Sequence, residues 1–485
     1  MTESVKNSRL RALIITISLV FILFFKFLPA PAGMTVPAMQ VLGIFAGVLL
    51  LWMTISIDWP SMLCILSIAF VPGMQMNKIL SATVGSSTFS FLLFTFMCTY
   101  TLSQTPFIRR CAIAFVSCPA ARGGPWAFTV LYFAATLFLG SFMSPTVLVI
   151  VMLTITEEIY AVFGLKKGSE AANMMMMGMV FCSGIAAGMT PIAHVFPLLS
   201  IGVYQSATGE SVNYASYMAA GIPVALITTA LMTLVFRFLM RPDMSEIRNL
   251  DVTKLKNELA PMNRKELTVL AIFFCVVMLW VLPGIVKPVM PVFAAYVDGF
   301  GTAMPPLLGA VTMAIITYEG KPLFNFRDAT SKGIPWASLI MTAGTLTIGS
   351  AMTNPEIGLI SWITDSIGPF AKTLAPLSLV LFFTFWSAVQ TNLSSNMVTA
   401  TVVAAIAYPI AEAAGSAVST PALTSIIGMM SAYAFATPPA MATVVFAIGS
   451  GWTTTGSVAK YGFTVMTIAA FTAAFIGYPI AAALM

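Results

Sequence analysis

Small uncharged polar side chains gather in one short stretch of an otherwise apolar sequence. The segment 391–400, TNLSSNMVTA, contains two Thr, two Ser and two Asn residues. Asn396 can donate two hydrogen bonds from its carboxamide, and Ser395 and Thr399 can donate one each. Hydroxyl and carboxamide donors can replace the water that an anion loses when it binds. The stretch therefore predicts a site for a small anion.

A second polar point occurs in the first half of the chain, in GSFMSPT at 140–146. Pro145 suits the first position of a helix, where its missing N–H leaves no hydrogen bond unmade. A helix that begins at Ser144-Pro145-Thr146 or at Ser395-Asn396 would point its N-terminus, with about half an elementary positive charge, at a ligand. We expect the two points to meet and to bind an anion between them.

The composition places these points in a membrane protein. The chain has 485 residues, of which 59% are hydrophobic and 8% are charged, whereas a soluble domain has about 25% charged residues. The segment Leu267 to Val286 is 20 residues long without a charge, enough to cross a hydrocarbon layer of about 30 Å. We expect an all-α, multi-pass protein of the cytoplasmic membrane.

The net charge of +6 lies largely in short basic clusters between apolar runs. Positive-inside topology explains such clusters, so we expect them and the N-terminus to face the cytoplasm. The first apolar run, Ala12 to Leu28, resembles a signal peptide but is longer than the usual apolar region of one. We therefore expect an uncleaved first helix.

Landmarks recur in the same order in the two halves of the chain. From Ser144 to Thr190 is 46 residues, and from Ser395 to Thr437 is 42. Proline disfavours helix in the residue before it, so Thr190-Pro191 and Thr437-Pro438 predict breaks in apolar helices. Interruptions at matching positions of two halves are typical of a secondary-transporter binding site. The alternative is that these small residues only pack helices together.

The repeat and the charge spacing predict five segments. They are N-terminal helices that form mostly scaffold at 1–122, first-repeat transport elements with a hairpin at 123–236, a charged cytoplasmic linker or surface helix at 237–266, second-repeat scaffold helices at 267–372, and second-repeat transport elements with a hairpin at 373–485.

These motifs resemble those of the divalent anion:sodium symporters, a family of carriers for dicarboxylates and related anions. Members bear Ser-Asn-Thr motifs at two hairpin tips and two Thr-Pro-Pro-like breaks. Here Ser395-Asn396-Met397 resembles the second tip, with Thr399 just beyond it, and Ser144-Pro145-Thr146 resembles the first. The segment 333–363, GIPWASLIMTAGTLTIGSAMTNPEIGLISWI, is similar to the family's tryptophan and glycine-rich helix.

The resemblance implies an inverted repeat of about eleven spanning helices and two re-entrant hairpins. It also implies a scaffold that forms a homodimer and a transport domain that moves like an elevator. The tips would contact substrate, one carboxylate per tip, and the breaks would border the same site. The implied substrate-binding residues are Ser144, Pro145, Thr146, Ser395, Asn396, Met397, Thr399, Thr190, Pro191, Thr437 and Pro438.

The chain departs from the family where sodium is held. Pro145 replaces the first tip asparagine, Met397 replaces a threonine, and Ala193 and Ala440 stand where asparagine commonly follows the prolines. Hard cations require oxygen ligands, so these changes argue against sodium coupling. We expect no cofactor and no strong metal site; the remaining candidate positions for a cation are Gly188, Thr391 and Ala436.

His194, the only histidine of the chain, follows the first break. If protonated, it could supply the positive charge that sodium would otherwise bring. The alternative is a neutral imidazole that is hydrogen-bonded within a helix interface.

We therefore predict secondary transport of small dicarboxylates of four or five carbons, such as malate, succinate, fumarate or 2-oxoglutarate, by sodium-independent exchange. A sodium- or proton-coupled symporter of di- or tricarboxylates is the alternative with the same fold. An intramembrane enzyme is disfavoured because hydrolase, metalloprotease and phosphate-binding motifs are missing from the sequence. A channel is the third possibility. The expected partners are dicarboxylate anions, the lipid bilayer and a second copy of the chain, with no nucleic acid.

Overall fold

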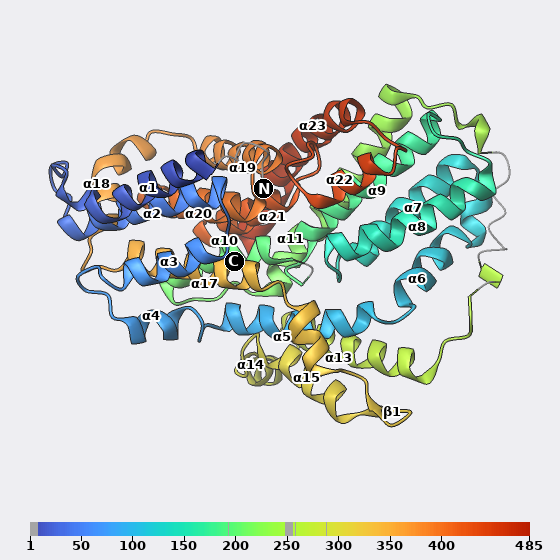
Figure 1. Cartoon of the computed structure of the whole chain (residues 1–485), viewed down its shortest axis with the longest axis horizontal. Coiled ribbons are helices and arrows are strands. Elements are labelled where there is room, and N and C mark those ends of the chain that lie inside the picture. Colours follow the sequence, from blue (N-terminus) through green and yellow to red (C-terminus); the bar gives the residue numbers. More distant parts are fainter. Residues whose placement is uncertain (1–7, 193, 248–255, 258, 288) are drawn as a thin grey trace.

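The computed structural model describes residues 8–192, 194–247, 256–257, 259–287 and 289–485, and nearly all of its regular elements are helices (Figure 1). The helices of the first half are α1 (Ser8–Phe24), α2 (Val36–Thr54), α3 (Trp59–Ile68), α4 (Met76–Ala82), α5 (Ser87–Ser103), α6 (Phe107–Val116), α7 (Pro125–Gly140), α8 (Pro145–Phe163), α9 (Glu170–Met189), α10 (Val195–Thr208) and α11 (Tyr214–Val235). Those of the second half are α13 (Arg264–Val286), α14 (Pro291–Asp298), α15 (Met304–Ile315), α16 (Phe326–Asp328), α17 (Trp336–Thr353), α18 (Leu359–Ala371), α19 (Pro376–Leu393), α20 (Asn396–Ala414), α21 (Thr420–Ala432), α22 (Ala442–Gly449), α23 (Thr455–Thr472) and α24 (Tyr478–Leu484).

Eight helical stretches within the described residues are long and apolar enough to cross a membrane. A ninth results if α4 and α5, which are bent by 49° at a short break, form one span. The prediction of an all-α membrane protein is confirmed to this extent: the fold is mostly helical and has several helices that could span a membrane. The expected count of about eleven spans and two re-entrant hairpins stays a prediction, because helix length and composition do not place a membrane.

One short β-hairpin interrupts the helices. Strands β1 (Thr317–Tyr318) and β2 (Lys321–Pro322) pair antiparallel across Glu319 and Gly320. Both turn residues have positive φ, 52° and 74°, as a two-residue type I′ turn requires. The sequence prediction missed this hairpin because two residues a strand are too few to show alternation.

Helix α9 forms the centre of the packed core. It lies against α7, α11 and α21, and its run Met174–Met177 is fully buried. A Cβ added at Gly178 would lie 2.1 Å from the ring of Phe133, so only glycine lets α7 approach this closely. Small residues at such crossings are how apolar helices pack inside a membrane.

The two polar points of the sequence fold as helix–turn–helix units. The first consists of α7 and α8, and the second of α19 and α20 (Figure 1). Pro145 occupies the first turn of α8, and Ser395 is the N-cap of α20. The predicted breaks are also present, since α9 ends at Met189 and α21 ends at Ala432.

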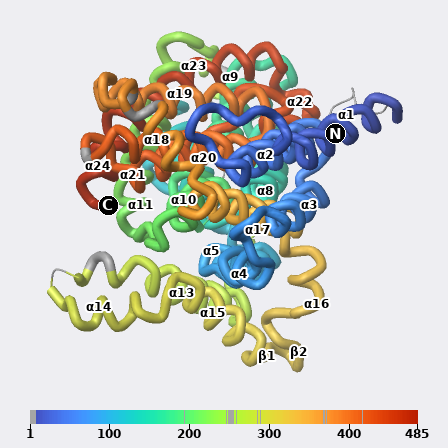
Figure 2. The backbone as a smooth tube through the Cα atoms, turned by 90° about the vertical axis from the view of Figure 1, so that its left-hand side faces the viewer, coloured from blue at the N-terminus to red at the C-terminus, as the bar shows by residue number. Residues whose placement is uncertain are grey.

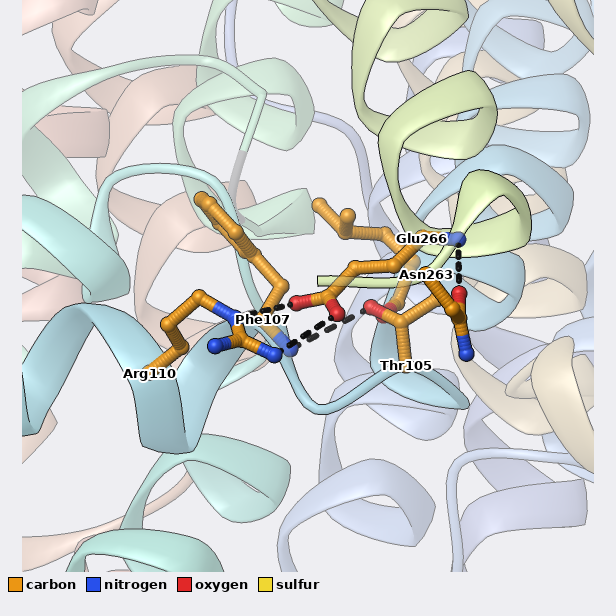
Figure 3. A network of polar contacts seen from close by, with 6 residues as sticks. Thr105, Phe107, Arg110, Asn263 and Glu266 are labelled. Atoms are coloured by element: carbon orange, nitrogen blue, oxygen red, sulfur yellow. Dashed lines mark hydrogen bonds and ion pairs between the residues drawn. The ribbon is translucent and has the colours of Figure 1, made fainter. Parts of the chain in front are cut away.

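Helix α6 ties the first hairpin to α13 through two adjacent arginines. Arg109 makes two hydrogen bonds of 3.0 and 2.8 Å to Glu158 on α8. Arg110 makes two of 3.0 and 3.1 Å to Glu266, whose backbone N–H is capped by Asn263 at 2.7 Å (Figure 3). Glu266 is 1% exposed and Arg110 20%, so the carboxylate of this second pair is buried and the pair fixes the start of α13.

Helices α13, α14 and α15 lie together on one side of the molecule, as the view in Figure 2 shows. The charged linker at 237–266 leads into α13. Residues 248–255 and 258 of this linker lie outside the described residues, and so does the part of the expected linker or surface helix that falls on them.

Candidate functional site

The first hairpin presents free hydroxyl groups at its tip. Ser144 is the N-cap of α8 but makes no side-chain capping bond. Within the described part of the chain, neither the Ser144 nor the Thr146 hydroxyl makes a hydrogen bond. Both residues are half-buried, whereas Pro145 between them is buried. The positive end of α8 and two available donors therefore face the same place.

That place is a cavity of about 420 Å³. Its described lining residues include no carboxylate. One wall comes from the first hairpin and from His194, and the other from α5, the segment 332–335 and the start of α17. The polar lining residues are Thr99, Tyr100, Ser103, Ser144, Thr146, His194, Lys332 and Ser338.

The second hairpin sends only Met397 into this cavity. The Thr399 hydroxyl donates to the backbone carbonyl of Ser395 at 3.0 Å, within its own helix. The Ser395 hydroxyl accepts from the Val398 N–H at 3.5 Å. Of the three predicted donors of this tip, Thr399 thus donates within its own helix, and Ser395 takes part in a local bond as an acceptor.

Ser395 borders a second cavity, of about 450 Å³, together with Arg11 and Asp58. Hydrogen bonds from the Ser56 hydroxyl and from the Trp59 N–H lower the pKa of Asp58, so its carboxylate is ionised. The second cavity therefore holds charges of both signs. The structure brings the two tips next to each other but opens their polar groups into different cavities.

Asn396 has a buried oxygen without a partner. The residue is 5% exposed, and its Oδ1 makes no hydrogen bond within the described residues. A buried carbonyl oxygen is almost always hydrogen-bonded, because leaving it bare is unfavourable. This unbonded oxygen can accept a hydrogen bond from a ligand or coordinate a cation.

Asn392, which the sequence analysis did not single out, organises the second hairpin. Its Nδ2 donates to the carbonyls of Ala388 and Tyr433, both at 2.8 Å. Its Oδ1 accepts from the N–H groups of Phe435 at 2.9 Å and Ala436 at 2.8 Å. The fully buried carboxamide thus uses all of its hydrogen-bonding capacity to hold the second break against α19.

The two breaks share one kind of contact with their hairpins. The Thr190 hydroxyl donates to the carbonyl of Ser141 at 2.6 Å, and the Thr437 hydroxyl donates to the carbonyl of Asn392. Each acceptor lies three residues before the tip serine, Ser144 or Ser395. The repeat read from the sequence is thus present in the contacts. Pro191 is buried and Pro438 half-buried, and neither borders the first cavity.

The ring of His194 is held in place at the cavity. Its Nδ1 accepts from the Val195 N–H at 3.0 Å, and it stacks on Phe196 with ring centroids 3.9 Å apart. An Nδ1 that accepts carries no proton, so the hydrogen lies on Nε2 and the imidazole is neutral. Protonation would remove this bond, which favours a donor role over the predicted charge.

The residual cation positions are occupied by protein contacts. The carbonyl of Gly188 accepts from the Tyr217 hydroxyl at 2.7 Å, the Thr391 hydroxyl donates to Ser431 at 2.6 Å, and the Ala436 N–H donates to Asn392. Ala193 lies outside the described residues. Within those residues, no group of three or more His, Cys, Asp or Glu could hold a metal ion.

Comparison with known proteins places the chain in a family. The profile of a family described as citrate transporter matches residues 47–428. The chain is 26% identical over 283 residues to a protein of Staphylococcus saprophyticus, and 24% identical over 351 residues to one of Staphylococcus aureus. Both are named sodium-dependent dicarboxylate transporter SdcS. The matches cover 56% and 70% of this chain but only 54% and 66% of those relatives. Because the profile matches well over half of its length, the chain belongs to the citrate transporter family and, with it, to the divalent anion:sodium symporters that its motifs resemble.

Proposed function

We propose that this protein is a secondary transporter that carries small di- or tricarboxylates across the cell membrane. One observation carries the proposal: the cavity at the first hairpin tip offers free hydroxyls and a lysine but no carboxylate. Neutral donors and a helix N-terminus can replace the hydration of a carboxylate without binding it too tightly for release. The family membership and the names of the two relatives support the same substrate class.

Sodium-coupled symport is the coupling that the relatives favour, because both are named sodium-dependent. The unpartnered Oδ1 of Asn396 supports it further, since sodium binds oxygen ligands and this acceptor is buried and bare. Asn396 would then belong to a cation site beside the cavity and not to the anion site.

Sodium-independent exchange remains the second candidate. It is favoured by Pro145 and Met397, which occupy tip positions where the family usually has oxygen-bearing side chains. The proposed architecture is the same in both cases: an inverted repeat with re-entrant hairpins, an elevator movement, a homodimeric scaffold and a cytoplasmic N-terminus.

Uptake by proteoliposomes distinguishes these candidates. We expect labelled succinate or citrate to accumulate under an inward sodium gradient and to stop doing so when choline replaces sodium. Uptake that ignores this replacement but is driven by unlabelled dicarboxylate inside would favour exchange. Flux that does not saturate would favour a channel, and no uptake of any carboxylate would contradict the proposed function.

A further inference from the structure

We propose that Lys332, with Tyr100 and Ser338, forms a second carboxylate subsite opposite the first hairpin tip. This inference rests on the proposed function and specifies it. One carboxylate of the substrate would bind Ser144 and Thr146, and another would bind Lys332 across the same cavity. The scaffold segments would therefore bind one carboxylate of the substrate, and the first hairpin would bind another.

Lys332 is the one residue among the described residues of the cavity lining that carries a full charge. The other titratable side chains there are Tyr100 and His194, and the hydrogen bond to Nδ1 keeps the imidazole neutral. The Tyr100 and Ser338 hydroxyls make no hydrogen bond within the described residues and are half-buried. A charged donor and two free hydroxyls thus share one wall.

The backbone that bears Lys332 is held firmly against α5. A Cβ added at Gly333 would lie 2.7 Å from Cβ and Cγ of Tyr100, so this contact admits only glycine. Ala329 is fully buried, and the Trp336 indole donates to the carbonyl of Thr330 at 2.9 Å. The π-helical turn Ala329–Gly333 therefore keeps the lysine at the cavity.

The lysine can exchange its present partner for a substrate. Its Nζ lies 3.1 Å from Asp328, and the two side chains are 67% and 46% exposed. Exposed ion pairs of neighbouring helix residues contribute little net stability. A carboxylate in the cavity can therefore compete with Asp328 for the ammonium group.

The second hairpin does not offer an equivalent subsite in this structure. Met397, its contribution to the cavity, is apolar, and Ser395 borders the other cavity. The Thr399 hydroxyl is bonded within α20. The subsite at Lys332 requires a ligand with at least two ionised carboxylates, so short dicarboxylates and citrate fit, whereas a monocarboxylate would use the hairpin tip alone.

The test is uptake of labelled succinate and citrate by the reconstituted full-length protein with Lys332→Gln. We expect KM to rise about tenfold, the loss expected for a hydrogen bond to a charged group, with a smaller change in kcat. Lys332→Arg should retain most of the affinity. The matched control is Lys321→Gln, because Lys321 is also exposed and nearby in sequence but does not line the cavity.

Asp328→Asn separates a binding role from a structural one. Removing the competing carboxylate should lower KM by about twofold to threefold, the opposite of Lys332→Gln, whereas a structural ion pair would respond to both changes in the same direction. An unchanged KM in Lys332→Gln, or a raised KM in Asp328→Asn, would overturn the subsite. Failure of the proposed function would look different, because the unaltered protein would then take up no carboxylate.

Discussion

The two hairpins are attached to the breaks that follow them by very different sets of contacts. In the first repeat, the Thr190 hydroxyl bonds to the carbonyl of Ser141, while the Ser141 hydroxyl turns back to Phe138 in its own helix. In the second, the corresponding link from Thr437 is joined by three bonds between the Asn392 carboxamide and the loop Tyr433–Ala436. The two repeats have the same order of elements, but fewer side-chain hydrogen bonds join the hairpin to the break in the first repeat than in the second.

This difference separates structural polar groups from those available to a ligand. Near the second tip, the Asn392 carboxamide and the Thr391 and Thr399 hydroxyls are bonded within the protein, whereas the Oδ1 of Asn396 is not. Polar groups at the first tip are unused and open into the cavity. Buried groups that are fully bonded rigidify a site, and free ones can bind. We therefore propose that the second hairpin serves mainly as framework and that the first binds the substrate.

Asn392→Ala should produce the largest effect on stability. It would leave two backbone N–H groups and the carbonyl of Tyr433 without partners in a buried place, at about 1–3 kcal/mol each. We expect a loss of at least about 3 kcal/mol and a large fall in Tm in a detergent-solubilised thermal melt. A Tm equal to that of the unaltered protein would show that the second break is held by other contacts.

Asn396→Ala is the matched contrast, four residues further on. Because its Oδ1 makes no bond to the described protein, removal should leave Tm nearly unchanged. Uptake should fall at least about tenfold, and the sodium concentration for half-maximal uptake should rise, if Asn396 binds the ion. A variant with normal uptake would remove Asn396 from the site. If Tm falls together with uptake in this variant, Asn396 has a structural role, as Asn392 has.

The sequence alone predicted much of this arrangement. The helix starts at Pro145 and Asn396 and the breaks at Thr190 and Thr437 depend on proline and small polar residues, which act locally. The sequence predicted Asn396 as a donor at the anion site but gave no role to Asn392, because that role depends on the fold of the loop at Tyr433–Ala436 about forty residues later.

Lys332 was missed for the same reason. It stands one residue before the tryptophan and glycine-rich segment that carries the family resemblance. Only tertiary packing brings that lysine to the cavity beside Ser144. Its position just before a recognised motif was the signal that could have been followed.

Thr146→Val tests whether the first tip contacts the substrate. The change keeps the size of the side chain and removes a free donor, so we expect KM for succinate to rise about fivefold, the value of one neutral hydrogen bond. Thr399→Val is the control at the other tip, because its hydroxyl is already bonded within α20 and does not reach the cavity. Equal effects of the two changes would show that the tips share the ligand after all.

The smallest expected effect compares Thr190→Val with Thr437→Val. Each removes one hydroxyl that donates to the carbonyl of a hairpin, a contribution of about 1 kcal/mol. After Thr437→Val, the bonds of Asn392 still hold the second break, so the hairpin should keep its place and uptake should change little. After Thr190→Val, the first break loses its hydroxyl link to Ser141, and the tip that bears Ser144 becomes less well positioned. Small differences in position are amplified in binding, so KM should rise more in Thr190→Val although the two losses in Tm are similar. Equal changes in KM would mean that the density of contacts around Asn392 does not make the second hairpin the more rigid of the two.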